Sequence, residues 1–308
     1  MHSVWQQMET IEASTVVLAE CEWRARQTAH RERMSALMRE HEAWASRGEK
    51  HPVHDFLFTY YSFKPSVLKR WHPGVGTALS GGAAREFLGS PFYSEVDGSV
   101  MVDPALLSES RRAGVEWMLG MLRATAARAA SFGCHGLHEW AMVYKQSQDK
   151  VRHADWPLRF APEVIARIVE ASTVRCTHFD AFRFFTAEAR SLNRVQPERS
   201  TIHALEQRGC LHANMDLFKW AAKLLPFAAS ELVADAFELA RDIREIDMRA
   251  SPYDLRALGC EPIPIEMPEG RAEYERHQRA FAARGEPIRA RLIAVCAAMV
   301  VSFCRGVA

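Results

Sequence analysis

The chain has 308 residues, of which 48% are hydrophobic and 25% are charged, and its formal net charge is +1. A chain of this size can bury a core of its own. The near-zero net charge excludes a global field that would draw the protein to nucleic acid or to a membrane, so such binding requires a local patch. The cysteines number seven, an odd count without a CxxC pair, which argues against a disulfide scaffold and indicates free thiols in a reducing compartment.

Two stretches bear on the location of the protein. Residues 1–12 lack a basic segment followed by an apolar one, so no signal peptide is expected. The most apolar run, residues 292–304, is shorter than the roughly 20 residues that a membrane span needs, and it predicts a buried C-terminal helix. We therefore expect a cytoplasmic protein that has no membrane partner.

The first half of the chain predicts helices followed by a small sheet. Residues 12–45 lack Pro and Gly and are rich in Ala, Glu, Arg and Met, which predicts one or two helices. Asp97-Gly98 lies between the short runs 92–96 and 99–102, which predicts a β-hairpin. Gly81-Gly82 separates residues 77–79 from residues 85–88 and predicts a second one. We expect a small antiparallel sheet within residues 76–103.

The remainder of the chain predicts helices. Asp103-Pro104 is typical of a helix start, with Asp as the N-cap and Pro in the first turn, and this helix is expected to reach residue 130. Further helices are predicted at residues 137–147, 162–171, 178–188, 211–225, 230–249, 269–283 and 286–305. The sequence thus predicts a mainly α protein with one globular domain, 1–308, consisting of an N-terminal helical arm (12–47), the small β insertion (76–103) and a helical core (104–306).

Aromatic and basic side chains alternate between residues 51 and 74. Basic groups can neutralise phosphates while aromatic faces stack on bases, so this pattern suits nucleic acid. The candidate substrate-binding residues in the segment are His54, Tyr60, Tyr61 and Trp71, and the candidate contacts to the DNA backbone are Lys64, Lys69 and Arg70. An aromatic core segment with a solvated basic edge would give the same pattern.

Three segments place a histidine near a cysteine at the apparent start of a helix. The pairs are Cys134 with His138, Cys176 with His178, and Cys210 with His212. A helix start also offers free N–H groups and the positive end of the helix dipole. We predict that at least three of the histidines 54, 138, 178 and 212 line one pocket with Glu139, Asp180 or Asp216. The alternative is that each histidine is an ordinary core or capping residue.

The same segments raise the question of a metal. Zn²⁺ takes Cys and His, usually four in a structural site, and the pairs at 176/178 and 210/212 could supply them. However, Cys-x-His is not a usual ligand spacing, and the paired Glu-x-x-His of a di-iron site is absent. We therefore predict no metal or other cofactor, and a helical metalloenzyme with His and carboxylate ligands remains an alternative.

Residues 230–249 carry acidic side chains along one helical face, whereas the other faces are almost entirely apolar. A helix this apolar is expected to be well buried, so some of the carboxylates need buried partners. The polar loop at its end could place Asp247, Arg249, Tyr253 and Asp254 at the rim of a pocket. An ordinary Asp/Ser/Pro turn would give the same loop sequence.

Five stretches together resemble a family of bacterial proteins usually labelled 3-methyladenine DNA glycosylase. They are HPVHDFLFTYYSFKPSVLKRWHPG (51–74), GLHEWAMVYK (136–145), THFDAFRFF (177–185), GCLHANMDLFKWA (209–221) and SELVADAFELARDIREIDMRASPYDL (230–255). The resemblance extends over most of the chain and differs from the helix-hairpin-helix and HEAT-like glycosylases. It implies a DNA-repair hydrolase that binds DNA and excises a damaged base by cleaving its N-glycosidic bond.

This reaction needs a carboxylate, because the transition state resembles an oxocarbenium ion and water must be oriented or deprotonated. The target base must also leave the helix and stack in a pocket. Asp180 is the first candidate catalytic residue, since Arg183 lies one helical turn away and can pair with it. Glu139 and Asp55 are the next candidates, although Glu139 follows His138 directly, so the two side chains are expected to point in different directions. A non-catalytic module that binds nucleic acid remains a further alternative.

Overall fold

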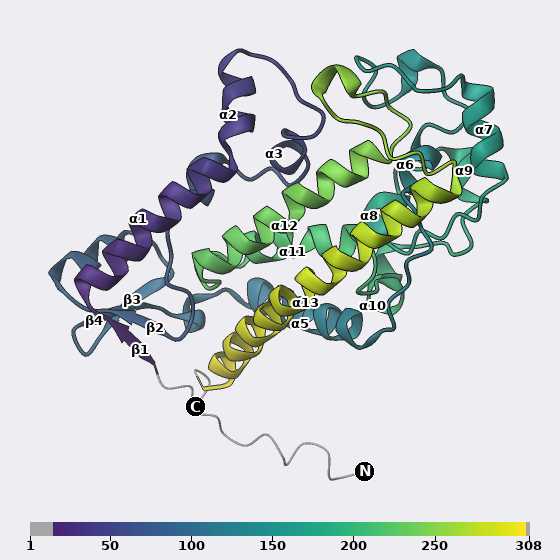
Figure 1. Ribbon diagram of the computed structural model, residues 1–308. Helices are drawn as coiled ribbons and strands as arrows, with labels where there is room; N and C mark the ends of the chain where they lie inside the picture. Colours follow the sequence, from purple (N-terminus) through teal and green to yellow (C-terminus); the bar gives the residue numbers. More distant parts are fainter. Residues whose placement is uncertain (1–14, 306–308) are drawn as a thin grey trace, which may run out of the picture.

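The computed structural model describes residues 15–305, and side chains as far as Phe303 (Figure 1). Helices dominate, and the strands form one small sheet beside the start of the first helix. This confirms the predicted mainly α fold. The buried apolar side chains form one contiguous cluster that extends along the chain from Leu18 to Phe303. Within the described residues, none of the helices is both long and apolar enough to cross a membrane.

The sheet has four strands in the order β1-β2-β4-β3. Their bounds are β1 Val16–Leu18, β2 Thr77–Leu79, β3 Tyr93–Val96 and β4 Ser99–Val102. The predicted hairpin joins β3 to β4, and both turn residues, Asp97 and Gly98, have positive φ, as a tight hairpin turn requires. The sheet is mixed rather than antiparallel, because β1 pairs with β2 in parallel and lies outside the predicted range.

The second predicted hairpin is wrong, because Gly82–Gly89 form a 3₁₀ helix (η1) instead of a strand. Three residues complete each turn of such a helix. Ala84 and Phe87 therefore lie on the same side, and both are buried in the core. Gly81, with φ of 96°, lets the chain turn tightly against the start of α1, where an added Cβ would lie 2.6 Å from Oε2 of Glu20.

The N-terminal helices are α1 (Glu20–Leu37) and α2 (Arg39–Ser46), as predicted, and α3 (Phe56–Tyr60) and α4 (Pro65–Leu68) lie in the aromatic segment that follows. Helix α1 packs along α12 (Ser230–Arg249). Arg33 of α1 donates to Asp235 at 2.7 Å and to Glu238 at 2.6 Å on the acidic face of α12. Part of that face is therefore paired with a neighbouring helix.

The centre of the molecule consists of α11 (Leu211–Lys223), α12 and α13 (Pro268–Arg305), with α5 (Glu109–Ala127) packed on α13. Helix α5 begins five residues later than predicted, because Asp103 caps only the 3₁₀ turn η2 (Pro104–Leu106). The two C-terminal helices predicted from the sequence are one continuous helix that includes Pro287. Gly285 lets this helix lie close to α11, since a Cβ there would meet Oδ1 of Asn214 at 2.3 Å.

The remaining elements are short and lie mostly at one end of the central helices (Figure 1). They are α6 (Leu137–Met142), η3 (Gln148–Lys150), α7 (Pro162–Glu170), α8 (Phe179–Phe182), α9 (Ala187–Arg190), η4 (Arg199–Thr201), α10 (Ile202–Leu205) and η5 (Arg256–Leu258). The helix predicted at 178–188 is divided into α8 and α9, because the hydroxyl of Thr186 caps the second helix by accepting from Ala189 N–H at 3.3 Å.

A buried histidine beside the sheet predicts acid sensitivity. His72 shares a 2.8 Å hydrogen bond with the hydroxyl of Tyr93, and burial, with Arg70 and His30 adding, lowers its pKa to about 4. The unfolded chain binds the proton near pH 6.5, so this group contributes stability above that pH and loses it as the pH falls toward 4. The shift corresponds to about 3 kcal/mol.

His72→Gln should therefore be less stable than the wild type at pH 7 and lose less stability on acidification. Urea unfolding at pH 7, 6, 5 and 4 measures the difference. Tyr93→Phe removes the hydrogen bond but keeps the imidazole, so it serves as the control that retains the acid sensitivity. If the difference in free energy of unfolding between the wild type and His72→Gln is the same at all four pH values, His72 is not the source of the acid sensitivity.

Candidate functional site

The cysteine–histidine segments converge in the interior. The ring of His212 lies 4.5 Å from that of His138 and 5.5 Å from that of His178, between centroids. The three residues come from the starts of α11, α6 and α8, and all three are buried. Gly136 and Gly209 permit this approach, since added Cβ atoms would lie 3.2 Å from the Tyr274 ring and 2.7 Å from the carbonyl oxygen of Ser131.

Asp247 of α12 is the centre of the first half of this cluster. Its Oδ1 lies 2.8 Å from Nε2 of His138, and its Oδ2 lies 3.3 Å from Nη1 of Arg244 and 3.9 Å from Nε2 of His212. Arg244 also donates to Glu139 at 3.1 Å. His138 and Glu139 thus both belong to this network, although adjacent helical residues were expected to point apart.

Burial and charge set the protonation of these groups. Burial lowers the pKa of His138, but the attraction of Asp247 and Cys134 outweighs it and raises the pKa well above its usual value. Burial, followed by repulsion from His138, lowers the pKa of His212 to about 3, so this ring is neutral. Burial and the nearby Asp247 raise the pKa of Glu139.

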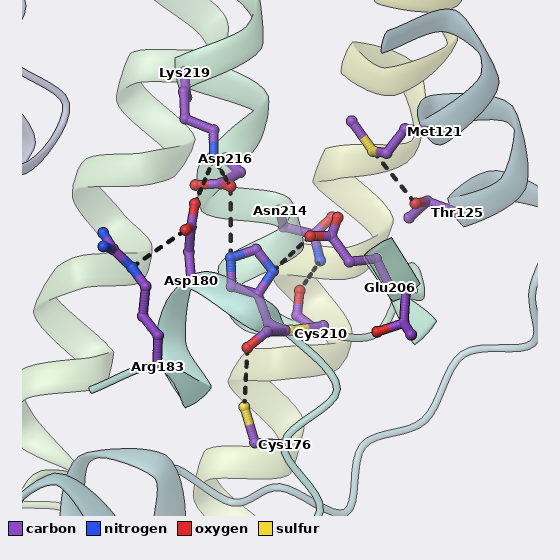
Figure 2. A network of polar contacts seen from close by, with 12 residues as sticks. Met121, Thr125, Cys176, Asp180, Arg183, Glu206, Cys210, Asn214, Asp216 and Lys219 are labelled. Carbon is purple, nitrogen blue, oxygen red and sulfur yellow. Dashed lines mark hydrogen bonds and ion pairs between the residues drawn. The ribbon is translucent and has the colours of Figure 1, made fainter. Parts of the chain in front are cut away.

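The second half of the cluster is a chain of alternating acidic and basic groups (Figure 2). Nδ1 of His178 lies 3.0 Å from Glu206, and its Nε2 lies 3.5 Å from Asp216. Asp216 pairs with Lys219, whose Nζ lies 3.0 Å from Asp180. This chain of contacts leads from the buried histidine to a carboxylate that is partly exposed.

Two further contacts stabilise carboxylates of this series. The hydroxyl of Tyr61 donates to Asp216 at 2.6 Å. The predicted pair of Asp180 and Arg183 is present, with Nε of the arginine 3.4 Å from the carboxylate (Figure 2). Asp180 is thus held by a cation on either side.

Asp180, the partly exposed end of this series of contacts, lies in a groove of about 860 Å³ between α5, α8, α10 and α11. Asp180 and Glu206 are its acidic lining residues. Its basic lining residues are Arg111, Arg183, Arg199, Lys219 and Lys223. Trp117 and Trp220 also line it, with ring centroids 5.9 Å apart, and Trp117 is 40% exposed. The groove therefore combines positive charge, aromatic faces and carboxylates.

Among the residues that the structure describes, two groups of side chains have ligand atoms within 4.8 Å of one another and could hold a metal. They are His138, His212 and Asp247, and His178, Asp180 and Asp216. In both groups a cation of the protein is already paired with the carboxylates. Arg244 contacts Asp247, and Lys219 lies between Asp180 and Asp216. These cations oppose the binding of a metal ion at either group.

Several predicted site residues lie elsewhere. His54 and Asp55 lie apart from the histidine cluster. His54 lines a separate hollow of about 260 Å³ beside α12, and Asp55 binds His41 at 2.8 Å and accepts from His51 N–H. Asp55 therefore stabilises its own turn, and its predicted catalytic role is not supported. Arg249 pairs with Glu273, and Asp254 pairs with Arg256 in its own loop.

The predicted aromatic residues of the 51–74 segment also contact other side chains of the protein. Tyr60 stacks on Phe56, with centroids 4.9 Å apart, next to Tyr61. Trp71 is 1% exposed, and its Nε1 donates to Glu231 at 2.9 Å, so it cannot offer a face to a base.

The three predicted phosphate contacts lie outside the groove, and Tyr253 lies in the interior. Lys69 pairs with Glu42 at 2.7 Å. Lys64 and Arg70 are exposed, and none of the three lines the groove. Tyr253 is buried against His153, with centroids 5.3 Å apart, and the nearby Glu139 adds to the rise that burial produces in its pKa.

Arg244 and Glu206 belong to the cluster but were not predicted from the sequence, and Asp247 lies in the interior rather than at the predicted rim. A signal for Arg244 did exist, because a basic residue within the apolar faces of a helix needs a buried partner. Nothing local identifies that partner, since Glu139 precedes Arg244 by 105 residues.

The buried guanidinium predicts a large effect on stability. Arg244→Met should destabilise the protein by about 3–5 kcal/mol, because it leaves buried carboxylates without their cation. Arg241→Met, three residues earlier on α12 and 38% exposed, is the matched control, with an expected loss below about 1 kcal/mol. Guanidinium unfolding measures both. If the double variant Arg244→Met/Glu139→Gln regains part of the lost free energy of unfolding, the unpaired charge is the cause. Equal losses of stability in Arg244→Met and Arg241→Met would contradict this explanation.

Comparison of the chain with family models, with curated proteins and with solved structures finds no match in any of the three. The family resemblance therefore stays a prediction, and the functional argument depends on the geometry of the groove and the cluster.

Proposed function

We propose that the protein is a DNA glycosylase that binds a DNA strand in the groove and hydrolyses the N-glycosidic bond of a damaged base with the help of Asp180. The observation that carries the proposal is the groove itself, which brings basic groups, two tryptophans and a carboxylate together on one surface. Its volume of about 860 Å³ lies within the range of ligand sites.

The charge of the groove supports a phosphate-bearing ligand. Five basic and two acidic residues line it, although the whole chain is nearly neutral. Arg111, Arg199 and Lys223 are exposed and can meet phosphates without leaving a buried partner. Such contacts supply most of the sequence-independent affinity of proteins for DNA.

The aromatic lining supports recognition of an extruded base. Stacking on an aromatic side chain contributes about 1–3 kcal/mol per base. Nζ of Lys219 lies 4.2 Å from the ring centroid of Trp220, which places the tryptophan next to the residue that holds Asp180. A base stacked on the exposed face of Trp117 or Trp220 would therefore lie on the same wall of the groove as the carboxylate.

Asp180 supplies the chemistry in this proposal. A carboxylate stabilises the positive charge that develops on the sugar and orients the attacking water. Lys219 and Arg183 hold the group in place. Burial lowers the pKa of Lys219, but Asp216 and Asp180 outweigh it and raise the pKa above its usual value, so the amine stays protonated. A protonated amine is no nucleophile, so the protein should release bases without cleaving the strand.

The test is incubation of the protein with duplexes and single strands that each carry one damaged base. Strands should break only after alkaline treatment, which cleaves abasic sites, and the free base should appear in equal amount. Borohydride should trap no covalent complex. Binding to DNA without base release from any lesion would refute the enzyme and support a non-catalytic module.

A further inference from the structure

Both carboxylates of the groove already have cationic partners. Asp180 lies 3.0 Å from Nζ of Lys219 and 3.4 Å from Nε of Arg183 (Figure 2). Glu206 lies 3.0 Å from Nδ1 of His178. Burial lowers the pKa of His178, but the attraction of its carboxylate neighbours outweighs burial and raises the pKa above its usual value. A positively charged ligand would therefore have to compete with cations of the protein for either carboxylate.

Trp220 lies beside two ammonium groups of the protein. Nζ of Lys219 is 4.2 Å and Nζ of Lys223 is 5.3 Å from the centroid of its ring. The face of an aromatic ring is the negative part of its quadrupole, so it attracts cations in this way. A base stacked on Trp220 would lie close to both ammonium groups. An uncharged base can stack there, whereas a cationic base would meet repulsion.

The summed charge of the groove has the same sign. Five basic and two acidic side chains line it, so its lining carries a net charge of +3, whereas that of the whole chain is +1. The pKa of Lys223 reflects this field, because burial lowers it and repulsion from Lys219 lowers it further. Two unit charges about 5 Å apart near a protein surface change an equilibrium constant by about 10²-fold or more. The charge of the base should therefore strongly affect its fit to the groove.

The charge of the base also decides which charge develops when the glycosidic bond breaks. An uncharged base leaves with both electrons of the bond between its nitrogen and C1′ of the sugar. It therefore gains negative charge, which nearby cations stabilise. A base that is already cationic leaves as a neutral molecule, so the cations have no developing negative charge to stabilise. The cations of the groove thus favour the departure of an uncharged base.

We propose that the protein releases an uncharged damaged base, which departs as an anion, and that Lys223 is a specificity-determining residue that disfavours cationic bases. This inference rests on the proposed glycosylase activity. Water supplies the hydroxyl group that bonds to C1′, and the proton that the water loses ends on the departed base. Deaminated bases such as hypoxanthine and uracil, and oxidised bases such as 8-oxoguanine, belong to the uncharged class. The nucleoside of 3-methyladenine, which the family label names, is cationic, so we expect the groove to disfavour it.

The test uses the full-length chain and duplexes that each carry one damaged base. Hypoxanthine, uracil and 8-oxoguanine form the uncharged set, and 7-methylguanine and 3-methyladenine form the cationic set. Single-turnover rates of base release are measured at saturating protein, after subtraction of spontaneous release. Cationic bases leave more easily without a catalyst, so this comparison is weighted against the proposal. At least one uncharged base should nevertheless be released at least about 10-fold faster than either cationic base.

Lys223→Glu tests the cause of this preference. The substitution reverses one charge beside Trp220 and leaves Asp180 with both of its partners. The rate for uncharged bases divided by the rate for cationic bases should fall at least about 10-fold. Because both rates are measured at saturating protein, the loss of DNA affinity that the same substitution causes does not affect their ratio. Lys64→Glu is the matched control, since this exposed lysine lies outside the groove, and its ratio should equal that of the wild type.

Three results would overturn the inference and leave the glycosylase activity standing. They are release of the cationic bases alone, equal rates for the two sets of bases, and an unchanged ratio in Lys223→Glu. Release from none of the duplexes would instead overturn the glycosylase activity and the inference with it. The failure of the inference and the failure of the proposed function are therefore distinguishable.

Discussion

Asp180→Asn is expected to lower the rate of base release by about 10²–10⁴-fold, the usual contribution of one catalytic acid or base. The substitution nearly preserves the shape of the side chain and removes its charge. Lys219 keeps Asp216 as a partner, so the fold should survive. Single-turnover base release, measured together with DNA affinity, should show a large loss of rate with little change in binding.

Glu188→Gln is the control for this measurement, because it removes an exposed carboxylate from the neighbouring helix α9. Its rate should equal that of the wild type. A folded Asp180→Asn protein with full activity would remove Asp180 from catalysis. Glu206, the other carboxylate of the groove, would then be the next residue to replace.

Replacement of Arg111, Arg199 and Lys223 by Ala should weaken DNA binding at low salt by about 10²-fold or more. Each lost phosphate contact should also reduce the slope of log affinity against log salt by about 0.7–0.9. The three side chains line the groove and are exposed. Titrations of a labelled oligonucleotide from about 50 to 300 mM salt, over which the Debye length falls roughly 2.4-fold, measure both effects.

The matched control removes the same charge from another surface. Replacement of Lys64, Lys69 and Arg70 by Ala also deletes three cations, but none of these residues lines the groove. Its salt slope should remain that of the wild type. The reverse result would be a reduced slope of log affinity against log salt for this control and an unchanged slope for the groove variant. It would show that DNA binds at the 51–74 segment and would contradict the proposed site.

Local signals in the sequence determined those elements whose causes are local. Helices α7 and α12 lie where their apolar periodicity predicts them, and the β3–β4 hairpin turns at Asp97-Gly98. Such elements need only neighbouring residues to satisfy their backbone hydrogen bonds or to meet the φ requirements of a turn. The repeated pairing of Cys with His at helix starts likewise identified the residues that converge.

Only the tertiary structure decided the partners of those residues. β1 forms a strand because β2, about 60 residues away in the chain, accepts its pairing. Helix α13 continues through Pro287 because its two ends bury side chains in one core. In the site, Asp247 lies 109 residues from His138 in the chain. The sequence by itself determined which polar side chains would be costly to bury, and packing decided which oppositely charged group would lie beside each of them, since a buried charge needs a partner and the fold alone supplies it.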